Sequence, residues 1–213
     1  MLCRDLGRIA YADALAEQER LVAERAGGFG VDTLLLCEHD AVVTVGRGGA
    51  DDLGDLDVPV VEISRGGEAT WHGPGQLVGY PVRRLEDGER DLHRVLRDTE
   101  ALVVDVLERL GIGSAGPDAE DGARAREGLT GVWAGERKVC SIGVAVRSWV
   151  TFHGFALNVC NDLAPFRAIR PCGLDGSVMT SVSEILGRTV EMDAARSALT
   201  AAAAGWPDYS SCT

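Results

Sequence analysis

The sequence predicts one domain of the α+β class (mixed α/β), with helices flanking a mixed, largely antiparallel sheet. Its 213 residues, 46% of them hydrophobic, suffice for a buried core without disulfides or a metal. Short apolar runs joined by turns outnumber the helical segments, which favours α+β over a doubly wound α/β fold. No repeat or linker divides the chain, so we expect residues 1–213 to form a single domain.

One helix and four strands are expected in the first eighty or so residues. The helical pattern covers residues 11–26, and Gly27 and Gly28 end it. Runs of aliphatic and β-branched residues predict strands at 34–36, 42–45, 58–63 and 76–82. A glycine-rich loop separates the last two strands.

The clearest helical segment covers residues 91–110. Its apolar side chains recur on one stripe, and Gly111 is placed to end the helix. The stripe consists of Leu92, Val95, Leu96, Leu102, Val103, Val106, Leu107 and Leu110. Residues 114–128, by contrast, are polar and charged, and we expect a surface loop there.

Strands dominate the next part of the chain, and two short helices follow. Strands are expected at 129–133, 138–146 and 150–159, and the turn at 134–137 predicts a hairpin between the first two. Ser181 and Glu184 have capping-box spacing for a short helix ending at Gly187. Asp193 can cap a last helix that runs through the alanines to Gly205.

The formal net charge of −12 argues against a protein that binds nucleic acid or an anionic membrane, because such a protein needs a broad basic surface. Residues 1–5 lack the charged and apolar regions of a signal peptide, and no apolar run approaches the roughly 18 residues of a membrane span. We therefore expect a cytoplasmic protein that binds neither nucleic acid nor membrane. An acidic partner would need a local basic patch, for which the candidates are Arg83, Arg84, Arg137, Arg147, Arg167 and Arg170.

The six cysteines are expected to be thiols in that compartment. No two of them have Cys-x-x-Cys spacing, and Cys37-Glu38-His39 is too tight for a standard zinc pair. We expect no metal site and no cofactor.

The densest group of special residues stands at 65–76, Arg-Gly-Gly-Glu-Ala-Thr-Trp-His-Gly-Pro-Gly-Gln. Its four glycines allow backbone amides to approach a ligand, and Arg65 offers a planar fork for an anion or a carbonyl. The segment lacks the P-loop pattern, and its glycine spacing differs from that of a dinucleotide-binding loop. Substrate contact is the interpretation we favour, and a tight structural crossover is the alternative.

A second candidate site is Cys172, which stands between Pro171 and Gly173 in a predicted loop. A reactive cysteine needs access and a nearby positive charge that favours its thiolate. The loop would provide access, and Lys138 or Arg170 could provide the charge. The alternative is that Cys172 is a small buried hydrophobic residue.

Lys138 is the only lysine, whereas the chain's other twenty basic residues are arginines. An arginine keeps its proton in a protein, but a lysine amine can lose and regain one. Chance survival in an arginine-rich composition is the alternative. Near Lys138, small residues at Gly143, Gly154 and Ala156 could open space for an apolar ligand or could allow two strands to pack closely. His72 and His153 are expected to be structural rather than catalytic.

These segments follow one another in a specific order. Gly131-Val132-Trp133 precedes Lys138, Ser-Ile-Gly stands at 141–143, His-Gly-Phe-Ala-Leu-Asn-Val at 153–159, and Pro-Cys-Gly at 171–173. Together with the segment at 65–76 they resemble the lipoyl(octanoyl) transferase family, the octanoyltransferases of lipoate biosynthesis. The resemblance extends from about Leu6 to residue 190.

The resemblance implies a fold, a reaction and a set of site residues. The implied fold is that of the biotin- and lipoate-protein ligase catalytic domain. The implied reaction moves an octanoyl group from octanoyl-acyl carrier protein to a lysine of a lipoyl domain, in the E2 subunits of 2-oxoacid dehydrogenases or in the glycine cleavage H protein, and the implied state is a monomer. Cys172 becomes the acyl-thioester nucleophile and Lys138 its partner. The implied acyl-substrate pocket comprises Arg65, Gly66, Gly67, Glu68, Ala69, Thr70, Trp71, His72, Ser141, Ile142, Gly143, Gly154, Phe155 and Ala156.

Two other functions remain as alternatives. An ATP-dependent lipoate- or biotin-protein ligase of the same fold would activate a free acid and would need no cysteine nucleophile. A non-catalytic binder of lipoyl domains or of carrier protein would tolerate the loss of Cys172.

Overall fold

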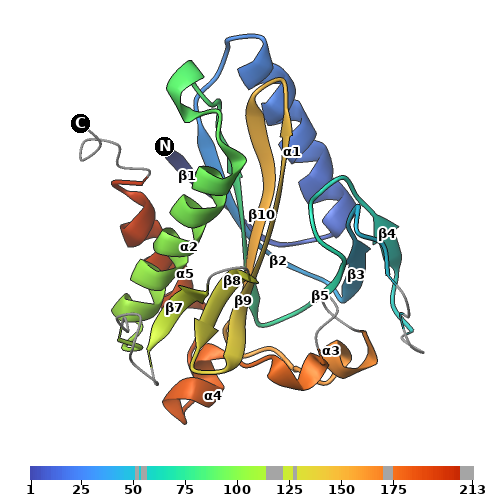
Figure 1. Cartoon of the computed structure of the whole chain (residues 1–213), viewed down its shortest axis with the longest axis vertical. Helices are drawn as coiled ribbons and strands as arrows, with labels where there is room; N and C mark the ends of the chain where they lie inside the picture. Colours follow the sequence, from blue (N-terminus) through green and yellow to red (C-terminus); the bar gives the residue numbers. More distant parts are fainter. Residues whose placement is uncertain (51–52, 54–56, 114–121, 127–128, 170–174, 207–213) are drawn as a thin grey trace.

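A seven-stranded mixed sheet organises the chain. The structure, a computed structural model, describes residues 1–50, 53, 57–113, 122–126, 129–169 and 175–206. The strand order is β1-β2-β6-β10-β9-β8-β7 (Figure 1). Strands β1 and β2 are parallel and the other neighbours are antiparallel, so the prediction of a mixed, largely antiparallel sheet in an α+β fold is confirmed. The strands are β1 (Leu2–Ile9), β2 (Thr33–His39), β6 (Gln76–Val82), β10 (Val150–Asn158), β9 (Arg137–Arg147), β8 (Leu129–Ala134) and β7 (Ala123–Arg126).

Helices cover both faces of this sheet. Helix α1 (Tyr11–Ala26) packs on one face, where it contacts β10 and β6, and α2 (Leu92–Arg109) packs on the other with α5 (Met192–Ala203) (Figure 1). The apolar stripe of α2 enters the larger core cluster with Leu34, Leu77 and Leu157. The side chain of Asp91 caps the helix by accepting the backbone N–H groups of His93 and Arg94.

A smaller three-stranded sheet stands beside the main one. It consists of β4 (Val60–Glu62), β3 (Val42–Val45) and β5 (Ala69–His72), with β3 in the centre. Helix α3 (Pro165–Ala168) contacts β5, where the rings of Trp71 and Phe166 meet edge to face at 5.7 Å between centroids. The glycine-rich segment 65–76 follows β4, contains β5 and ends at the first residue of β6, so it passes from the smaller sheet to the main one.

Most predicted elements are confirmed, including the first helix, the helix at 92–109 and the hairpin of β8 and β9. Ser181 caps α4 (Val182–Leu186) as expected, and Gly187 ends it with φ of 62°. Asp193 was wrong as a cap, because α5 begins at Met192 with Glu191 before it. The expected loop at 114–128 was wrong at 123–126, which form β7, while 114–121 and 127–128 lie outside the described residues.

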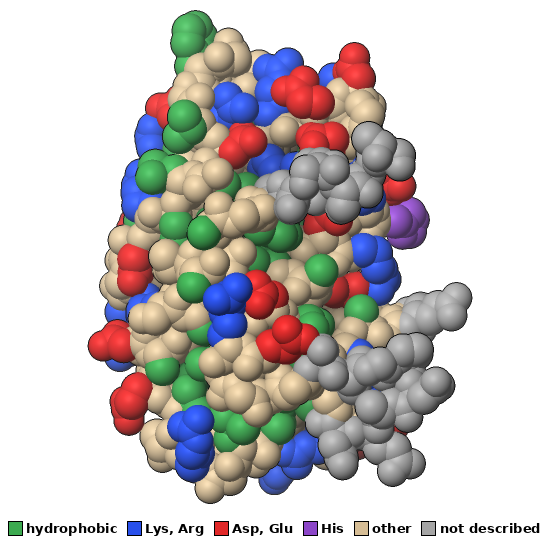
Figure 2. All heavy atoms as spheres, turned by 90° about the vertical axis from the view of Figure 1, so that its left-hand side faces the viewer, with side chains coloured by type: hydrophobic (Ala, Val, Ile, Leu, Met, Phe, Trp, Pro, Cys, Tyr) green, Lys and Arg blue, Asp and Glu red, His purple; other side chains and the backbone are tan. Residues whose placement is uncertain are grey.

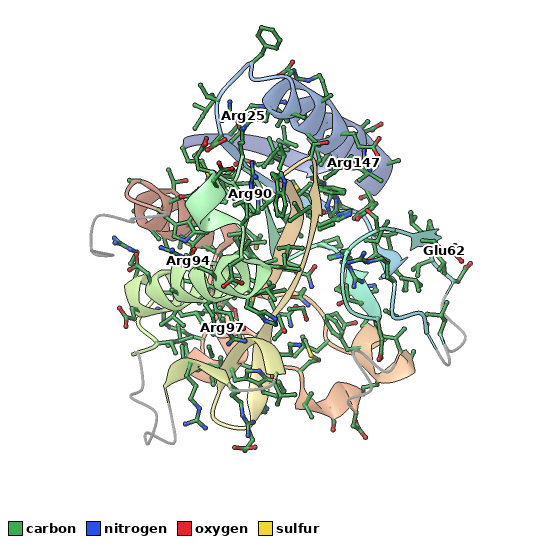
Figure 3. All side chains as sticks on the ribbon, turned by 45° about the horizontal axis from the view of Figure 1, so that its top comes forward. Arg25, Glu62, Arg90, Arg94, Arg97 and Arg147 are labelled. Atoms are coloured by element: carbon green, nitrogen blue, oxygen red, sulfur yellow. The ribbon has the colours of Figure 1, made fainter. Side chains whose placement is uncertain are left out.

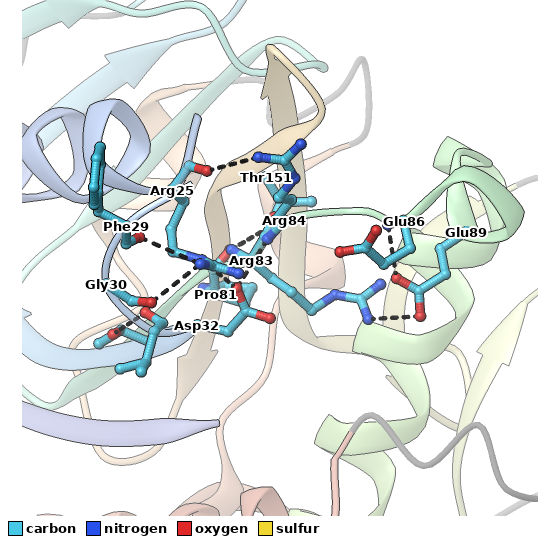
Figure 4. A network of polar contacts seen from close by, with 12 residues as sticks. Arg25, Phe29, Gly30, Asp32, Pro81, Arg83, Arg84, Glu86, Glu89 and Thr151 are labelled. Atoms are coloured by element: carbon cyan, nitrogen blue, oxygen red, sulfur yellow. Dashed lines mark hydrogen bonds and ion pairs between the residues drawn. The ribbon is translucent and has the colours of Figure 1, made fainter. Parts of the chain in front are cut away.

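A polar network fixes the end of the molecule where α2 begins (Figure 4). Asp32 accepts the Arg25 guanidinium at 2.7 Å and the Arg84 backbone N–H at 3.0 Å. Arg83 pairs with Glu89 of the short helix η1 (Asp87–Glu89) at 3.5 Å. Arg83, one of the arginines suggested for a basic patch, therefore forms an ion pair within the protein.

The surface over α2 and α5 carries charges of both signs between small apolar areas (Figure 2). Figure 3 labels Arg90, which stands just before α2, and Arg94 and Arg97, which belong to α2. Arg90 pairs with Asp87, and Arg97 pairs with Glu100. Among the described residues, no helix is long and apolar enough to cross a membrane.

Candidate active site

The segment that begins at Arg65 runs along an edge of β9. Strand β8 pairs with β9 only from Arg137 to Cys140, and farther along the Gly66 N–H donates to the Val144 carbonyl at 3.1 Å. A Cβ on Gly143 would lie 3.0 Å from the Gly66 carbonyl oxygen and 3.0 Å from Arg65 Cδ. The absence of a side chain at Gly143 therefore allows the segment to cover the strand edge.

The guanidinium of Arg65 is buried and directed at β3. Its Nη2 donates to the Thr44 carbonyl at 2.8 Å and to Thr44 Oγ1 at 3.1 Å, and Nη1 donates to the Gly66 carbonyl at 3.0 Å. The planar fork that the sequence suggested for a substrate thus contributes to joining the two sheets. The segment serves as a structural crossover in addition to any contact with substrate.

Lys138 is buried on a cavity wall, with 5% of its surface exposed. The cavity has a volume of about 320 Å³, near the lower end of the range for small-molecule pockets. Lys138 Nζ lies 5.6 Å from the centroid of the Trp133 ring, within the range of a cation–π contact. The other lining residues are mostly apolar or lack a side chain: Gly66, Gly67, Leu92, Leu96, Leu129, Ile142 and Val144, with Thr130 and Arg47.

Gly131 shapes the space that Lys138 occupies. Its φ of 129° is one that residues with side chains rarely adopt. A Cβ there would lie 2.6 Å from Lys138 Cε, 3.3 Å from Lys138 Nζ and 2.6 Å from the Cys140 carbonyl oxygen. The lysine side chain therefore lies directly against the Gly131 backbone.

Glu100 is a residue that the sequence analysis missed. Its carboxylate is buried, with 1% of the residue exposed, and accepts the Gly131 N–H at 2.9 Å. Burial raises the pKa of Glu100, while the Gly131 N–H and the charges of Arg97 and Lys138 lower it. A signal was present, because Glu100 stands four residues after Leu96 and three before Val103 and so interrupts the apolar stripe of α2.

Other predicted pocket residues lie on the opposite face of β9. Ile142 and Val144 face the cavity beside Lys138, whereas Ser141 and Gly143 alternate to the other face and border a cavity of about 30 Å³. The lining of this small cavity is Tyr11, Arg65, Thr70, His72, Val78, Tyr80, Ser141, Gly143, His153, Gly154, Phe155 and Ala156. The structure therefore divides the implied pocket between two cavities that meet at the Arg65 segment and β9.

Tyrosines and histidines on the α1 face form a buried cluster. His39 Nε2 lies 2.7 Å from Tyr80 Oη, and the ring of Tyr11 stacks on His72 with centroids 5.9 Å apart. Burial, reinforced by the charge of His39, lowers the pKa of His72 to about 3, and burial lowers that of His153 to about 4. Burial also raises the pKa of Tyr80. Burial therefore keeps both histidines neutral at neutral pH.

Several predicted pocket residues border neither cavity. Ala69 and Trp71 belong to the core of the smaller sheet, and Glu68 packs near Gly48. Gly154, by contrast, borders the small cavity and is also crowded, since a Cβ there would lie 2.1 Å from the Gly79 carbonyl oxygen. Close packing of strands thus explains Gly154.

Cys172 lies outside the described residues. The described cysteines are disfavoured as thiolates: burial raises the pKa of Cys3, Cys37, Cys140 and Cys160. Of these four thiols Cys160 is the exposed one, and the carboxylates of Glu38 and Glu191 raise its pKa further.

Comparisons with known proteins place the chain in a family. A family model described as the lipoyl protein ligase A/B catalytic domain matches residues 10–204. The octanoyltransferase of Geobacter metallireducens is 51% identical over 193 residues, which cover 90% of this chain and 86% of that protein. The octanoyltransferase of Geobacter sulfurreducens is 49% identical over 204 residues, which cover 95% of this chain and 83% of that protein.

Solved structures show the same fold at lower sequence identity. Lipoate-protein ligase A bound with ATP superimposes with a TM-score of 0.71 at 22% identity, covering 95% of this chain and 84% of that one. A bi-partite lipoate protein ligase from Thermoplasma acidophilum gives a TM-score of 0.70 at 22% identity, covering 95% and 81%.

The chain therefore belongs to the lipoyl protein ligase A/B catalytic-domain family. Within that family its curated relatives at about half identity are octanoyltransferases, so the protein is an acyltransferase, and the resemblance stated from its motifs is confirmed.

Proposed function

We propose that this protein transfers an octanoyl group from octanoyl-acyl carrier protein to a specific lysine of a lipoyl domain, through a thioester on Cys172. The observation that carries the proposal is identity of about one half to octanoyltransferases over nine tenths of the chain. The site supports it, because the single lysine is buried on the wall of an apolar cavity.

The reaction proceeds in two successive acyl transfers, first to Cys172 and then to the target lysine. The Cys172 thiolate attacks the thioester carbonyl of the donor, the bond to the carrier sulfur breaks, and the released carrier thiolate takes up a proton. The neutral amine of the target lysine then attacks the Cys172 thioester, an amide forms, and the amine's proton is released as the Cys172 sulfur leaves. Neither transfer changes an oxidation state or consumes ATP.

Lys138 is proposed to move these protons. A free cysteine has a pKa of about 8.5 and is only a few per cent thiolate at neutral pH, so the nucleophile needs help to ionise. An ammonium beside Cys172 favours the thiolate, and the same amine can take up and release the protons of the leaving thiol and the attacking amine. Arginine could provide the charge but not the proton transfer.

The apolar cavity is proposed to hold the acyl chain. Its walls come from α2, β8 and β9, with Leu92, Leu129 and Ile142 among the apolar residues. Burying the octanoyl chain would contribute roughly 5 kcal/mol at about 0.8 kcal/mol per methylene. The acceptors would be lipoyl domains of 2-oxoacid dehydrogenase E2 subunits and the glycine cleavage H protein, served by a cytoplasmic monomer.

Intact mass spectrometry tests the thioester. The protein is mixed with octanoyl-acyl carrier protein without ATP, and the acyl adduct is mapped to a peptide. We expect one octanoyl group on Cys172, discharged as the lipoyl domain becomes octanoylated. Cys172→Ala should carry no adduct, whereas Cys160→Ser, which removes the exposed described thiol, should acylate like the parent.

Two outcomes would contradict the proposal. Activity that appears only with free octanoate and ATP would indicate an adenylating ligase. A lipoyl domain that binds but remains unmodified, with no adduct on the enzyme, would indicate a non-catalytic binder.

A further inference from the structure

Glu100 is a buried carboxylate on the face of α2 that packs against β8 and β9. Its Oε1 accepts the Gly131 N–H at 2.9 Å, and its Oε2 accepts Arg97 Nη1 at 2.5 Å. A carboxylate in the interior is costly unless it is paired and hydrogen-bonded. Both carboxylate oxygens have partners here, and Arg97 provides the pairing from the exposed side of the helix.

Gly131 connects this carboxylate to Lys138. The peptide that donates to Glu100 belongs to the residue against which the Lys138 side chain lies, since a Cβ on Gly131 would come within 3.3 Å of Nζ. The positive charge of Lys138 also acts on Glu100, where it lowers the carboxyl pKa against the effect of burial. Glu100 is thus linked to Lys138 in two ways, through the Gly131 backbone and through the interaction of their charges.

We propose that Glu100 is the positioning residue of Lys138: its carboxylate fixes Gly131 and holds the lysine side chain in its charged form at the wall of the acyl cavity. The inference rests on the proposed function for the meaning of that charge. In the reaction, a lysine held as ammonium stabilises the Cys172 thiolate before the acyl group arrives.

Other groups near Lys138 do not provide this charge. From α2, Arg97 faces Glu100 and carries the same sign as the lysine. On β9, Cys140 interacts with both Lys138 and Glu100, and burial raises its pKa so that the thiol stays neutral. Arg47, which also lines the cavity, is positive too. Among these described neighbours, Glu100 supplies the negative charge.

The single lysine makes the test direct. Protein labelled with ¹³C at lysine Cε gives one lysine side-chain resonance, whose shift against pH reports the titration of Lys138 alone. In Glu100→Gln the amide oxygen can still accept the Gly131 N–H, so the backbone contact persists while the charge is removed. We expect the titration midpoint to fall by about one pH unit relative to the parent.

Two further variants control for structure. Glu108→Gln makes the same chemical change at an exposed position of α2, and we expect the Lys138 midpoint to be unchanged. Arg97→Gln alters an exposed partner of Glu100, so it tests the inference even where Glu100→Gln fails to fold. Removing this guanidinium leaves more of the carboxylate's field on the lysine, and the midpoint should rise. Midpoints unaltered in both Glu100→Gln and Arg97→Gln would overturn the inference.

Acyl-enzyme formation separates this inference from the proposed function. Should the parent form an octanoyl adduct on Cys172, the pH at half-maximal acylation in Glu100→Gln should shift along with the lysine midpoint. An adduct that forms in both proteins with identical pH profiles would contradict the role of Glu100 and leave the transferase proposal standing. Absence of the adduct in the parent would contradict the transferase proposal, while the lysine titration would still decide whether Glu100 acts on Lys138.

Discussion

The two faces of the central sheet bury polar groups in different ways. On the α1 face, Tyr80, His39 and His72 lie in a cluster that burial keeps neutral, with the pKa of His72 lowered to about 3. On the α2 face, Glu100 is buried close to Lys138, and an arginine at the surface pairs with it. The α1 face keeps its histidines neutral next to the buried guanidinium of Arg65, whereas the α2 face buries a carboxylate near a lysine.

We infer from this difference that the two faces have separate tasks. A cluster whose histidine titrates near pH 3 cannot exchange protons at neutral pH, so it suits structure and shape. A lysine beside a buried carboxylate can remain charged and still exchange a proton with a bound group. We therefore expect substitutions on the α1 face to alter stability and those on the α2 face to alter the chemistry of transfer.

The largest expected effect is that of Lys138→Arg. The variant keeps a positive charge on the α2 face but cannot exchange its proton, so transfer should fall by about 10²- to 10⁴-fold, the usual contribution of a positioned acid–base group. Single-turnover transfer to a lipoyl domain measures the loss. Arg109→Lys, a change between the same residue types at the exposed end of α2, should retain the parent rate. An active Lys138→Arg enzyme would show that charge alone suffices.

The next largest effect is expected at Gly131, which holds Lys138 against β8. In Gly131→Ala the new Cβ would meet Lys138 Cε at 2.6 Å, on a backbone whose φ is 129°. Strain and overpacking together should cost about 2–4 kcal/mol of unfolding free energy. Displacement of the lysine should also slow transfer by about 10²-fold.

Urea unfolding and single-turnover transfer check these two effects separately. Gly111→Ala is the matched control, because its φ of 98° is also strained for alanine while its Cβ would meet no atom within 4 Å. It should lose stability and keep the transfer rate of its folded fraction. A Gly131→Ala protein with parental transfer would show that the lysine does not depend on this contact.

The fold could be predicted best where the chain buries its own apolar pattern. The stripe of α2 and the capping residue Ser181 gave the correct helices because the signals are local. Strand β1 was missed because its residues are half-buried or exposed without alternation. Its extended conformation depends on parallel pairing with β2, which the local sequence does not show. The short edge strand at 123–126, Ala-Arg-Ala-Arg, could not be predicted either, because it depends on pairing with its neighbour β8.

The candidate site shows a similar division. Lys138 could be selected from the sequence because composition alone singled it out, and the structure places it on a cavity wall. The division of the predicted pocket between the two faces of the sheet could not be predicted from the sequence, because it depends on which strand edge the Arg65 segment covers. Glu100 was missed because a charged residue in an amphipathic helix is ordinarily a solvated one, and only packing against β8 shows it to be buried.

A smaller effect is expected from the pH dependence of stability on the α1 face. The unfolded chain protonates His72 below about pH 6.5, whereas the folded protein resists protonation until about pH 3. The stability present above pH 6.5 is therefore lost as the pH falls through this window, by up to about 1.4 kcal/mol per pH unit. Between pH 7 and 5.5 the parent should lose about 1 kcal/mol through this histidine.

Urea unfolding at the two pH values measures that loss. His72→Gln should be less stable at pH 7 but should lose about 1 kcal/mol less than the parent between pH 7 and 5.5. His93→Gln, a change at an exposed histidine of α2, should keep the parental pH dependence. Equal pH dependence in the parent and in His72→Gln would mean that His72 is not held neutral by the fold.

The smallest effect on the transfer reaction is expected from Tyr80→Phe. The hydroxyl of Tyr80 lies 2.7 Å from His39 Nε2, and its removal leaves a buried ring nitrogen with a poorer partner, the Cys37 sulfur at 3.4 Å. Loss of one such hydrogen bond should lower the unfolding free energy by about 1–2 kcal/mol. Because burial lowers the pKa of His39, His72 and His153, the pH profile of transfer should nevertheless match that of the parent. A displaced profile would show that protons cross the sheet between the two faces, and the separation of structure from chemistry would then be wrong.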